Sequence, residues 1–347
     1  MPSMTSPRLL RAADNLIVNS FAVESGESVL ITADYKTESS LLDAVAGAVS
    51  RVGGKPLIAL APVLPYQGGL SDPYVGDALR AAAAESDVWL DFCFPYHAGS
   101  GMHSAAMQRK RTRYCLLALS SADTLERLYG CVDFEAMLEF NIALADYFAK
   151  AEGETVRFTC PKGTDVRMTI DKMKLPRKGL CKDPGTYTVP GTQSFYPVME
   201  SVQGRIVIQA LFDEYYRALR EPITIVADGG IKEMFGGGVE DRISFDRALR
   251  RAGGGKDYGN FIHFTLGFHP AAALTQTQFI EDIRLPGSNA IGMGLPWWEE
   301  GGGENHPDGI ILDQSLWVGT EQLVDNGDFV GPEPLRRLHD AMTRRLD

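Results

Sequence analysis

The chain has 347 residues, of which 44% are hydrophobic and 23% are charged, and its formal net charge is −11 at pH 7. This length exceeds what one compact core usually supports, so we expect two domains. The composition is that of a globular protein without an apolar run of the roughly 18 residues that a bilayer span needs, and the acidic balance disfavours a nucleic-acid partner.

The N-terminal segment and the cysteines bear on the cellular compartment. Charged residues interrupt residues 1–21, where a secretion signal would need a continuous apolar stretch. The five cysteines are odd in number, widely spaced and mostly in apolar surroundings, which is typical of reduced, buried thiols. The sequence therefore predicts a cytoplasmic protein that has neither a membrane nor a nucleic-acid partner.

The first half of the chain alternates between strand and helix patterns. Strand-like runs at 28–35, 57–62, 88–94 and 114–119 are separated by helix-like segments at 38–54 and 75–87 and by a helical stretch after residue 103. Such alternation predicts a parallel sheet covered by helices, and a long amphipathic helix at 133–153 leads out of it.

After about residue 153 the pattern changes to short β-type runs broken by Gly and Pro, with a helix or two, such as one at 244–253. The runs are 155–160, 165–170, 204–210, 223–231, 260–268 and 309–318. We therefore expect an α/β protein with two domains. Residues 1–152 would form a parallel α/β domain, and residues 153–347 a mixed, largely antiparallel, β-rich α+β domain.

Six histidines make a census of candidate site residues possible. His339 lies in a charged terminal helix, where solvent exposure explains it. His97 lies in a Pro- and Gly-rich loop with no obvious partner. The candidates that remain are His103, His263, His269 and His306.

His306 and Asp308 stand two positions apart at the start of the run 309–318. In an extended segment such side chains point to the same face, so the imidazole and the carboxylate converge. By the same alternation, His263 shares a face with Phe261 and Thr265. A lone strand histidine is more often a core residue than a ligand, and an H-x-D pair is short enough to arise by chance. Together, however, two imidazoles and one carboxylate are the ligand set that holds non-haem Fe(II) with three open positions.

These segments resemble the 2,5-dihydroxypyridine 5,6-dioxygenase family of Fe(II) ring-cleaving enzymes, which is built on the aminopeptidase T fold. The similar stretches are GMHSAAM (101–107), QSFYPVMESVQGRIVI (193–208), IHFTLGFHP (262–270) and HPDGIILDQSLWV (306–318). The resemblance implies an aminopeptidase T-like fold with Fe(II) bound by His263, His306 and Asp308. It also places the family's mobile acid/base histidine on His103. The other interpretation of His103 is a residue at a helix N-terminus that Ser104 caps.

A planar substrate needs a slot lined by aromatic and a few polar side chains. The segments expected around the metal supply the predicted substrate-binding residues, although aromatic residues in such segments also commonly form core. An acidic, glycine-rich stretch at 299–305 is interpreted as a lid. The predicted substrate-binding residues are Met102, Ser104, Phe195, Phe268, His269 and Trp297.

The sequence departs from aminopeptidase T relatives, which hold two metals with two glutamates, an H-x-D and a further histidine. The positions that look equivalent lie near Thr192, at His263 and at Ala290, so a dinuclear centre cannot be assembled and a mononuclear site is predicted. The segment PWWEEGGG (296–303) is also unlike the pyridine family, so the resemblance leaves the substrate open.

The preferred hypothesis is a non-haem Fe(II)-dependent dioxygenase that uses O₂ to cleave the ring of a hydroxylated aromatic or N-heteroaromatic such as 2,5-dihydroxypyridine. The resemblance implies a homo-oligomer, a dimer or larger. One alternative is an aminopeptidase T-like metallohydrolase of peptide or amide bonds, with Glu299 or Glu300 as general base. Another is a non-catalytic metal-binding protein. Mn(II) and Zn(II) remain alternatives to Fe(II).

Overall fold

The computed structural model describes residues 6–174, 180–254, 258–296 and 306–343. The chain forms two compact units, which are described separately below. Unit 1 consists of Met1–Leu138, Lys178–Pro190 and Met342–Asp347, and unit 2 consists of Glu139–Arg177 and Gly191–Ala341.

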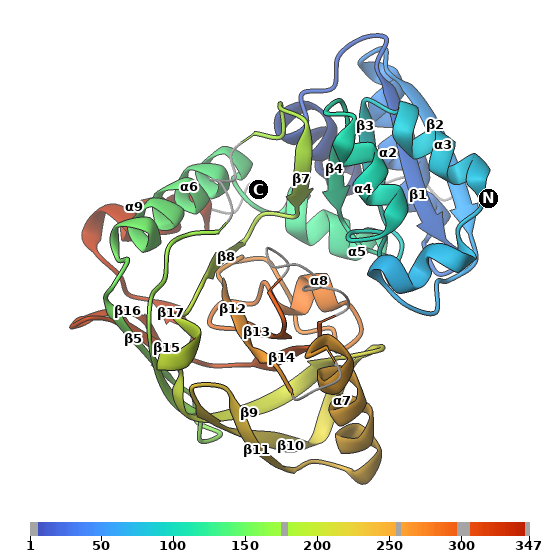
Figure 1. The fold of residues 1–347 in the computed structure, drawn as a ribbon. Coiled ribbons are helices and arrows are strands. Elements are labelled where there is room, and N and C mark those ends of the chain that lie inside the picture. The colour runs from blue at the N-terminus through green and yellow to red at the C-terminus, as the bar shows by residue number, and fades with distance from the viewer. Residues whose placement is uncertain (1–5, 175–179, 255–257, 297–305, 344–347) are drawn as a thin grey trace. The chain divides into compact units, whose positions relative to one another are not determined.

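A parallel sheet lies at the centre of unit 1 (Figure 1), and among the described residues its strand order is β2-β1-β3-β4-β7. The central strands β1 and β3 are almost fully buried, whereas the edge strand β2 alternates between exposed and half-buried residues. This contrast is expected when helices cover both faces of a parallel sheet and leave its edge open. The strands are β1 (Ser28–Asp34), β2 (Lys55–Ala61), β3 (Val88–Asp91), β4 (Arg113–Leu116) and β7 (Gly185–Thr188).

Helices connect these strands, and serine caps begin two of them. The Ser6 hydroxyl accepts a hydrogen bond from the N–H of Arg8 at 3.1 Å, and the Ser100 hydroxyl accepts one from the N–H of His103 at 3.1 Å. The helices are α1 (Pro7–Asp14), α2 (Ser39–Arg51), α3 (Asp77–Glu85), α4 (Gly101–Gln108) and α5 (Ala122–Leu125), with the short segments η1 (Asn15–Ser20), η2 (Gly68–Tyr74) and η3 (Glu126–Gly130). The Ser100 cap thus fixes the start of the helix that carries His103.

Two aromatic residues on neighbouring strands, Trp89 and Tyr114, lie in a buried hydrophobic cluster of unit 1 that also contains Met102. Their ring centroids are 4.6 Å apart. The Trp89 indole donates to the Thr32 hydroxyl at 2.9 Å, and the Tyr114 hydroxyl donates to Asp91 at 2.8 Å. Because each polar atom has a partner, the two large rings can be buried without leaving an unpaired donor.

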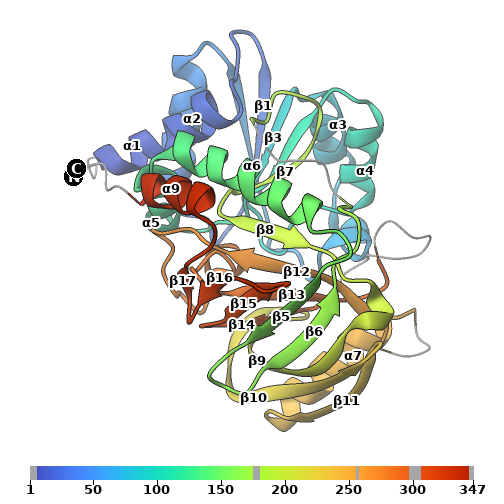
Figure 2. The ribbon, with the colours of Figure 1, turned by 90° about the vertical axis from the view of Figure 1, so that its left-hand side faces the viewer.

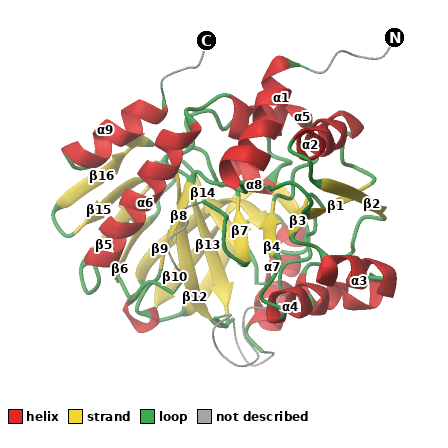
Figure 3. Cartoon of the chain, turned by 90° about the horizontal axis from the view of Figure 1, so that it is seen from above, coloured by secondary structure: helices red, strands yellow, loops and turns green. Residues whose placement is uncertain are grey.

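Unit 2 is built on a large antiparallel sheet, parts of which are clear in Figures 2 and 3. The structure describes twelve strands in it, ordered β17-β16-β15-β5-β6-β9-β14-β13-β12-β8, with β10 paired to β9 and β11. The strands are β5 (Thr155–Thr159), β6 (Asp165–Thr169), β8 (Thr192–Phe195), β9 (Gln203–Phe212), β10 (Tyr216–Asp228), β11 (Ile231–Gly236), β12 (Asn260–Gly267), β13 (Asn289–Gly294), β14 (Asp308–Ile311), β15 (Ser315–Val318), β16 (Glu321–Asp325) and β17 (Asp328–Phe329). Together the two sheets confirm the predicted fold class.

A row of phenylalanine rings packs helix α6 (Phe134–Lys150) onto the sheet of unit 2. The centroids of Phe148 and Phe195 are 4.9 Å apart and the rings are stacked, and Phe264 lies 5.7 Å from Phe195. The other helices with residues in this unit are α7 (Val239–Ala252), α8 (Phe279–Asp282) and α9 (Glu333–Met342), with the short turn η4 (Met199–Ser201). In the described part of the chain, no helix combines the length and the apolarity of a membrane span.

The contacts divide the chain differently from the expected division after residue 152, in three places, one of which is Met342–Asp347, a segment of unit 1. Glu139 to Lys150 of α6 belong to unit 2, where Phe148 packs on Phe195. The segment Lys178–Pro190 belongs to unit 1, because β7 pairs in parallel with β4. This pairing joins residues about 70 positions apart, and local patterns do not contain that information.

The run 309–318, predicted as one strand, is two strands, so that prediction was wrong. β14 pairs with β13 and β9, and β15 pairs with β5 and β16. The extended conformation is interrupted between them at Asp313, whose φ of 54° lies in the left-handed region. Because the residues on both sides of this interruption are apolar, the hydrophobic pattern of the sequence did not reveal it.

Candidate metal centre

Three neighbouring strands bring the predicted metal ligands together. His263 of β12 is in register with Gly292 of β13, and Gly292 is in register with Asp308 of β14. His306 lies two residues before Asp308, at the entry to β14. The side chains of His306 and Asp308 therefore meet that of His263, which comes from two strands away, over the backbone of Gly292.

Gly292 leaves the space in which the ligands meet. A Cβ atom built on this residue would overlap the imidazole of His263, with Nε2 as the nearest atom. No positive φ is recorded for Gly292, so steric space, not backbone conformation, is what requires glycine here. The His263 ring thus lies over the backbone of β13, where only a residue without a side chain fits.

The donor atoms of the three residues converge. His263 Nε2 lies 3.3 Å from His306 Nε2 and 3.5 Å from Asp308 Oδ1, and His306 Nε2 lies 3.6 Å from Asp308 Oδ2. Atoms bound at about 2.1 Å to one metal ion lie about 3 to 3.5 Å from one another, so the spacing fits a shared cation. The chemistry of the set, two imidazoles and one carboxylate, also fits a divalent transition metal.

Burial gives this cluster unusual electrostatics. The side chains of His263, His306 and Asp308 are 12%, 17% and 6% exposed. Burial raises the pKa of Asp308 to about 6, although the neighbouring His306 opposes the shift. A buried carboxylate beside two imidazoles is stabilised when it is paired with a cation, which is what a bound metal provides.

Two hydroxyl groups form a hydrogen-bonded chain that ends at His263. Thr265 lies two residues further along β12, and Ser194 lies opposite Thr265 on β8. The Thr265 hydroxyl lies 3.0 Å from His263 Nδ1 and 2.8 Å from the Ser194 hydroxyl. A partner at Nδ1 orients the ring so that Nε2 can bind a metal. The predicted alternation held for His263 and Thr265 but broke at Phe261, where the register shifts and the ring lies 6.2 Å from that of Phe264.

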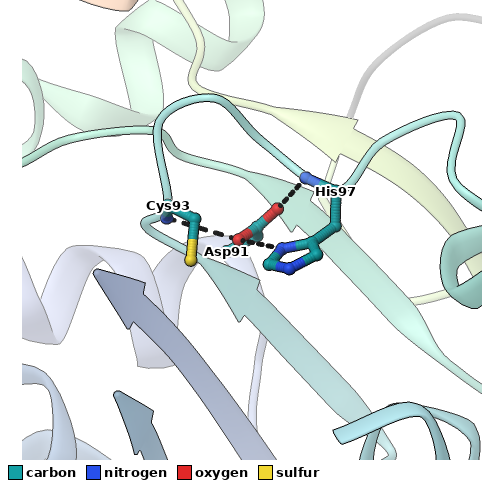
Figure 4. A group of neighbouring side chains, drawn as sticks. All are labelled: Asp91, Cys93 and His97. Carbon is teal, nitrogen blue, oxygen red and sulfur yellow. Dashed lines mark hydrogen bonds and ion pairs between the residues drawn. The ribbon is translucent and has the colours of Figure 1, made fainter. Parts of the chain in front are cut away.

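A second group with ligand-type atoms within 4.8 Å of one another lies in unit 1 and contains Asp91, Cys93 and His97 (Figure 4). Asp91 Oδ1 accepts from Thr32 at 2.8 Å, from His97 Nδ1 at 3.0 Å and from the N–H of Cys93 at 3.3 Å. Oδ2 accepts from the N–H of His97 and from the Tyr114 hydroxyl, both at 2.8 Å. Both oxygens are therefore occupied by protein donors, and Asp91 serves as an anchor for the loop after β3.

The protonation states of Asp91 and Cys93 agree with a structural role for Asp91 as the anchor of the loop after β3. Burial alone would raise the pKa of Asp91, but the charge of His97 and the hydrogen bonds together hold it below its ordinary value. Burial raises the pKa of the Cys93 thiol, which keeps the sulfur protonated and a poor ligand. His97, for which the sequence offered no partner, thus pairs with a carboxylate six residues earlier. The spacing D-x-C-x₃-H was the signal that could have found it.

His103 lies in the first turn of helix α4 in unit 1. Ser100 caps this helix and Ser104 is exposed, so the alternative in which Ser104 is the cap is wrong. Burial lowers the pKa of His103 to about 4. The ring packs edge-on against Tyr114 at 4.6 Å. The imidazole is therefore neutral at pH 7.

The structure places most of the predicted substrate-binding side chains in packed surroundings. Met102 lies in the core cluster of unit 1, and Phe195 and Phe268 are buried in unit 2. His269 is buried, and its Nδ1 accepts from the N–H of Ala271 at 3.2 Å. Their role in substrate binding stays a prediction.

The predictions for Trp297, for the stretch 299–305 and for His339 have different outcomes. Trp297 and the expected lid at 299–305 lie outside the described residues. His339, expected to be solvated, has a 16% exposed side chain and stacks on Phe329 at 5.0 Å, so that expectation was wrong.

Comparison with known proteins identifies the family. A family model described as 2,5-dihydroxypyridine 5,6-dioxygenase (NicX) matches residues 14–291, most of the chain. The chain belongs to this family. As a member of the 2,5-dihydroxypyridine 5,6-dioxygenase family it is a ring-cleaving dioxygenase, which acts on a small aromatic substrate with O₂.

Solved structures agree on the fold of this dioxygenase. The 2,5-dihydroxypyridine dioxygenase from Pseudomonas putida KT2440 is 18% identical, with a TM-score of 0.71 over 94% of this chain and 98% of that chain. Wild-type AmpT, an aminopeptidase T, from Thermus thermophilus is 16% identical, with a TM-score of 0.62 over 93% of this chain and 99% of that chain. A search of curated proteins finds no match. The aminopeptidase T-like fold expected from the sequence is confirmed.

Proposed function

We propose that this dioxygenase uses one Fe(II) ion, held by His263, His306 and Asp308, to open the ring of 2,5-dihydroxypyridine or a closely related hydroxylated N-heteroaromatic. The observation that carries the proposal is the convergence of two imidazole nitrogens and a carboxylate within 3.3–3.6 Å of one another. When bound, Fe(II) at such a set supplies adjacent open positions for O₂ and substrate.

The chain's own residues would set the charge of the site. Two neutral imidazoles and one carboxylate around a divalent ion leave one net positive charge. A site of that charge in buried surroundings favours an anionic hydroxypyridine. Thr265 and Ser194 would hold the His263 ring in place while the substrate enters.

We assign the acid/base role to His103. Ring opening of a hydroxylated substrate needs a group that takes a proton from the ring hydroxyl and later returns one. A neutral imidazole can do both. Because burial lowers the pKa of His103 to about 4, its imidazole is unprotonated, the form that can accept a proton, before the substrate arrives.

A mononuclear site is favoured over the dinuclear centre of an aminopeptidase T-like hydrolase. In the described residues, the ligand group in unit 2 contains two histidines and one aspartate, with no fourth His, Cys, Asp or Glu. The resemblance places two of that hydrolase's ligands near Thr192 and at Ala290, and neither of these side chains is a strong metal donor. Among the residues that the structure describes, a second metal therefore lacks the ligands to clamp an attacking water.

An anaerobic experiment tests the proposal. The full chain is loaded with Fe(II), mixed with 2,5-dihydroxypyridine without oxygen, and then exposed to air while oxygen uptake and the ring's ultraviolet absorbance are followed. We expect one O₂ consumed for each ring lost. The variants H306A and D308N should retain less than about one hundredth of the turnover and of the bound iron, since each removes a ligand.

The matched control is H339Q, which removes an imidazole from helix α9, and we expect its turnover to stay near that of the parent chain. Iron-loaded, fully active H306A would contradict the ligand assignment. If no hydroxylated heteroaromatic caused oxygen uptake and the chain cleaved peptide or amide bonds with zinc, the hydrolase function would be favoured over the proposed dioxygenase function.

The proposal also includes the cellular setting inferred from the sequence. A cytoplasmic location and assembly as a dimer or larger homo-oligomer stay predictions. Cell fractionation and light scattering coupled to size-exclusion chromatography would check them.

A further inference from the structure

Each ring nitrogen of His103 has a hydrogen-bond partner within unit 1. The N–H of Gly99 donates to Nδ1 at 3.3 Å, and Nε2 lies 2.9 Å from the hydroxyl of Thr186. Gly99 stands in the loop just before α4, whereas Thr186 stands on β7, 83 positions after His103. Strand β7 joins the sheet beside β4 and so brings Thr186 to the imidazole.

The chemistry of these partners decides which nitrogen carries the proton. A backbone N–H can only donate, so Nδ1 accepts with its lone pair. The Thr186 hydroxyl gives its own proton to the Met107 sulfur at 3.5 Å, and a thioether can only accept. The Thr186 oxygen is therefore left to accept from Nε2, which must be protonated.

The surroundings of the ring hold this arrangement. Tyr114 lies edge-on to the imidazole at 4.6 Å, and Trp89 lies 6.4 Å away. The Tyr114 hydroxyl is tied to Asp91, the anchor of the loop after β3. The ring thus packs against a side chain that is itself fixed by a hydrogen bond.

We infer that Thr186 is a positioning residue that holds His103 as the tautomer with its proton on Nε2, which leaves the Nδ1 lone pair to take up the substrate proton. This inference rests on the proposed acid/base role of His103. In the proton transfer, the O–H bond of the substrate breaks and an Nδ1–H bond forms, which gives an imidazolium that later returns this proton. Nδ1 leaves the Gly99 N–H to do so, and that bond is the longer of the two.

Nuclear magnetic resonance of the full-length, metal-free chain labelled with [¹⁵N]histidine tests the tautomer. The chain has six histidines, and the variant H103Q identifies the His103 signals by their loss. We expect the parent chain to show the proton on Nε2. In T186V, which keeps the side-chain shape but removes the hydroxyl, the two nitrogen signals should shift toward a mixture of both tautomers, and T186S should restore the parent spectrum.

Oxygen uptake with 2,5-dihydroxypyridine tests the positioning role. We expect kcat of T186V to fall at least about tenfold with KM within about twofold, because proton transfer is impaired and substrate binding is not. T186S should recover kcat. Y187F is the matched control, because the neighbouring Tyr187 hydroxyl donates to the Asp183 carbonyl and not to His103.

A proton on Nδ1 in the parent chain would overturn the inference, as would a T186V variant with the parent spectrum or the parent kcat. The spectrum needs neither metal nor substrate. If all variants, the parent included, lack oxygen uptake while the spectra behave as expected, the proposed function fails and the tautomer assignment stands.

Discussion

Gly292 is the residue whose replacement most directly tests the geometry of the metal centre. A methyl group at this position would overlap the His263 imidazole, which cannot move without leaving its Thr265 partner. We expect G292A to weaken Fe(II) binding by at least about tenfold, the size of loss seen when the surroundings of a ligand are disturbed. Anaerobic titration with a ferrous indicator measures this directly.

The control for this variant is G309A on the neighbouring strand β14. A Cβ there would overlap the side chain of Ile208 instead of a ligand, so it adds a similar packing cost of about 1–3 kcal/mol without blocking the site. Unchanged iron affinity in G292A, or equal losses in both variants, would show that the space over β13 does not matter for the metal.

At the scale of elements, the loop after β3 depends on one carboxylate. Asp91 is fully buried and accepts five hydrogen bonds, so we expect D91N to destabilise unit 1 by about 3 kcal/mol at pH 7. Because the folded-state pKa of Asp91 is lowered below its ordinary value of 3.8, its contribution is fully present above that pH and is lost as the pH falls further. The difference between parent and D91N should therefore shrink toward low pH.

Urea unfolding at several pH values between 7 and 3 measures that difference. D87N is a suitable comparison, since Asp87 pairs with the half-exposed Arg111 and the loss should stay near 1 kcal/mol or less. A D91N variant as stable as the parent at pH 7 would show that the five hydrogen bonds do not anchor the loop.

The elements also show what local patterns contain and what they omit. Periodicity located β1, β3, β12 and the helix α7 because each buries one face or both along its whole length. It could not foresee that β7 joins the first sheet, because that pairing depends on a partner far away in the sequence. The break at Asp313 was hidden for a related reason, since both sides of the turn are apolar.

For the molecule as a whole, the sequence was enough to predict the fold class, which is confirmed, and to name the proposed ligands, but not to predict the surroundings of the site. H-x-D spacing fixes two side chains on one face, and this is a local property. The space at Gly292, the support from Ser194 and the partner of His103 on β7 all come from strands whose order only the folded chain defines. Composition does not separate an aromatic residue that lines a pocket from one that fills a core, so the substrate-binding role of Phe195, which stacks on Phe148, stays a prediction.

The two units make a last prediction possible, because all three proposed ligands lie in unit 2. A ligand that binds only the folded state stabilises the part of the structure that holds it, by about 2.7 kcal/mol at one hundred times its Kd. We therefore expect Fe(II), added without oxygen, to bind at one ion per chain. It should slow amide hydrogen exchange in β12, β13 and β14, while exchange in β1 and β3 stays the same.

The same measurement separates the two clusters of ligand-type side chains. In D308N the protection by Fe(II) should disappear, whereas in D91N the ion should still bind and still protect β12 and β14. Protection of β3 and of the loop that carries His97, or a second ion per chain that D91N removes, would make the buried Asp91 group a metal site. In that case the hydrogen bonds that fill both Asp91 oxygens would have to open for the ion, and exchange at the N–H groups of Cys93 and His97 would report it.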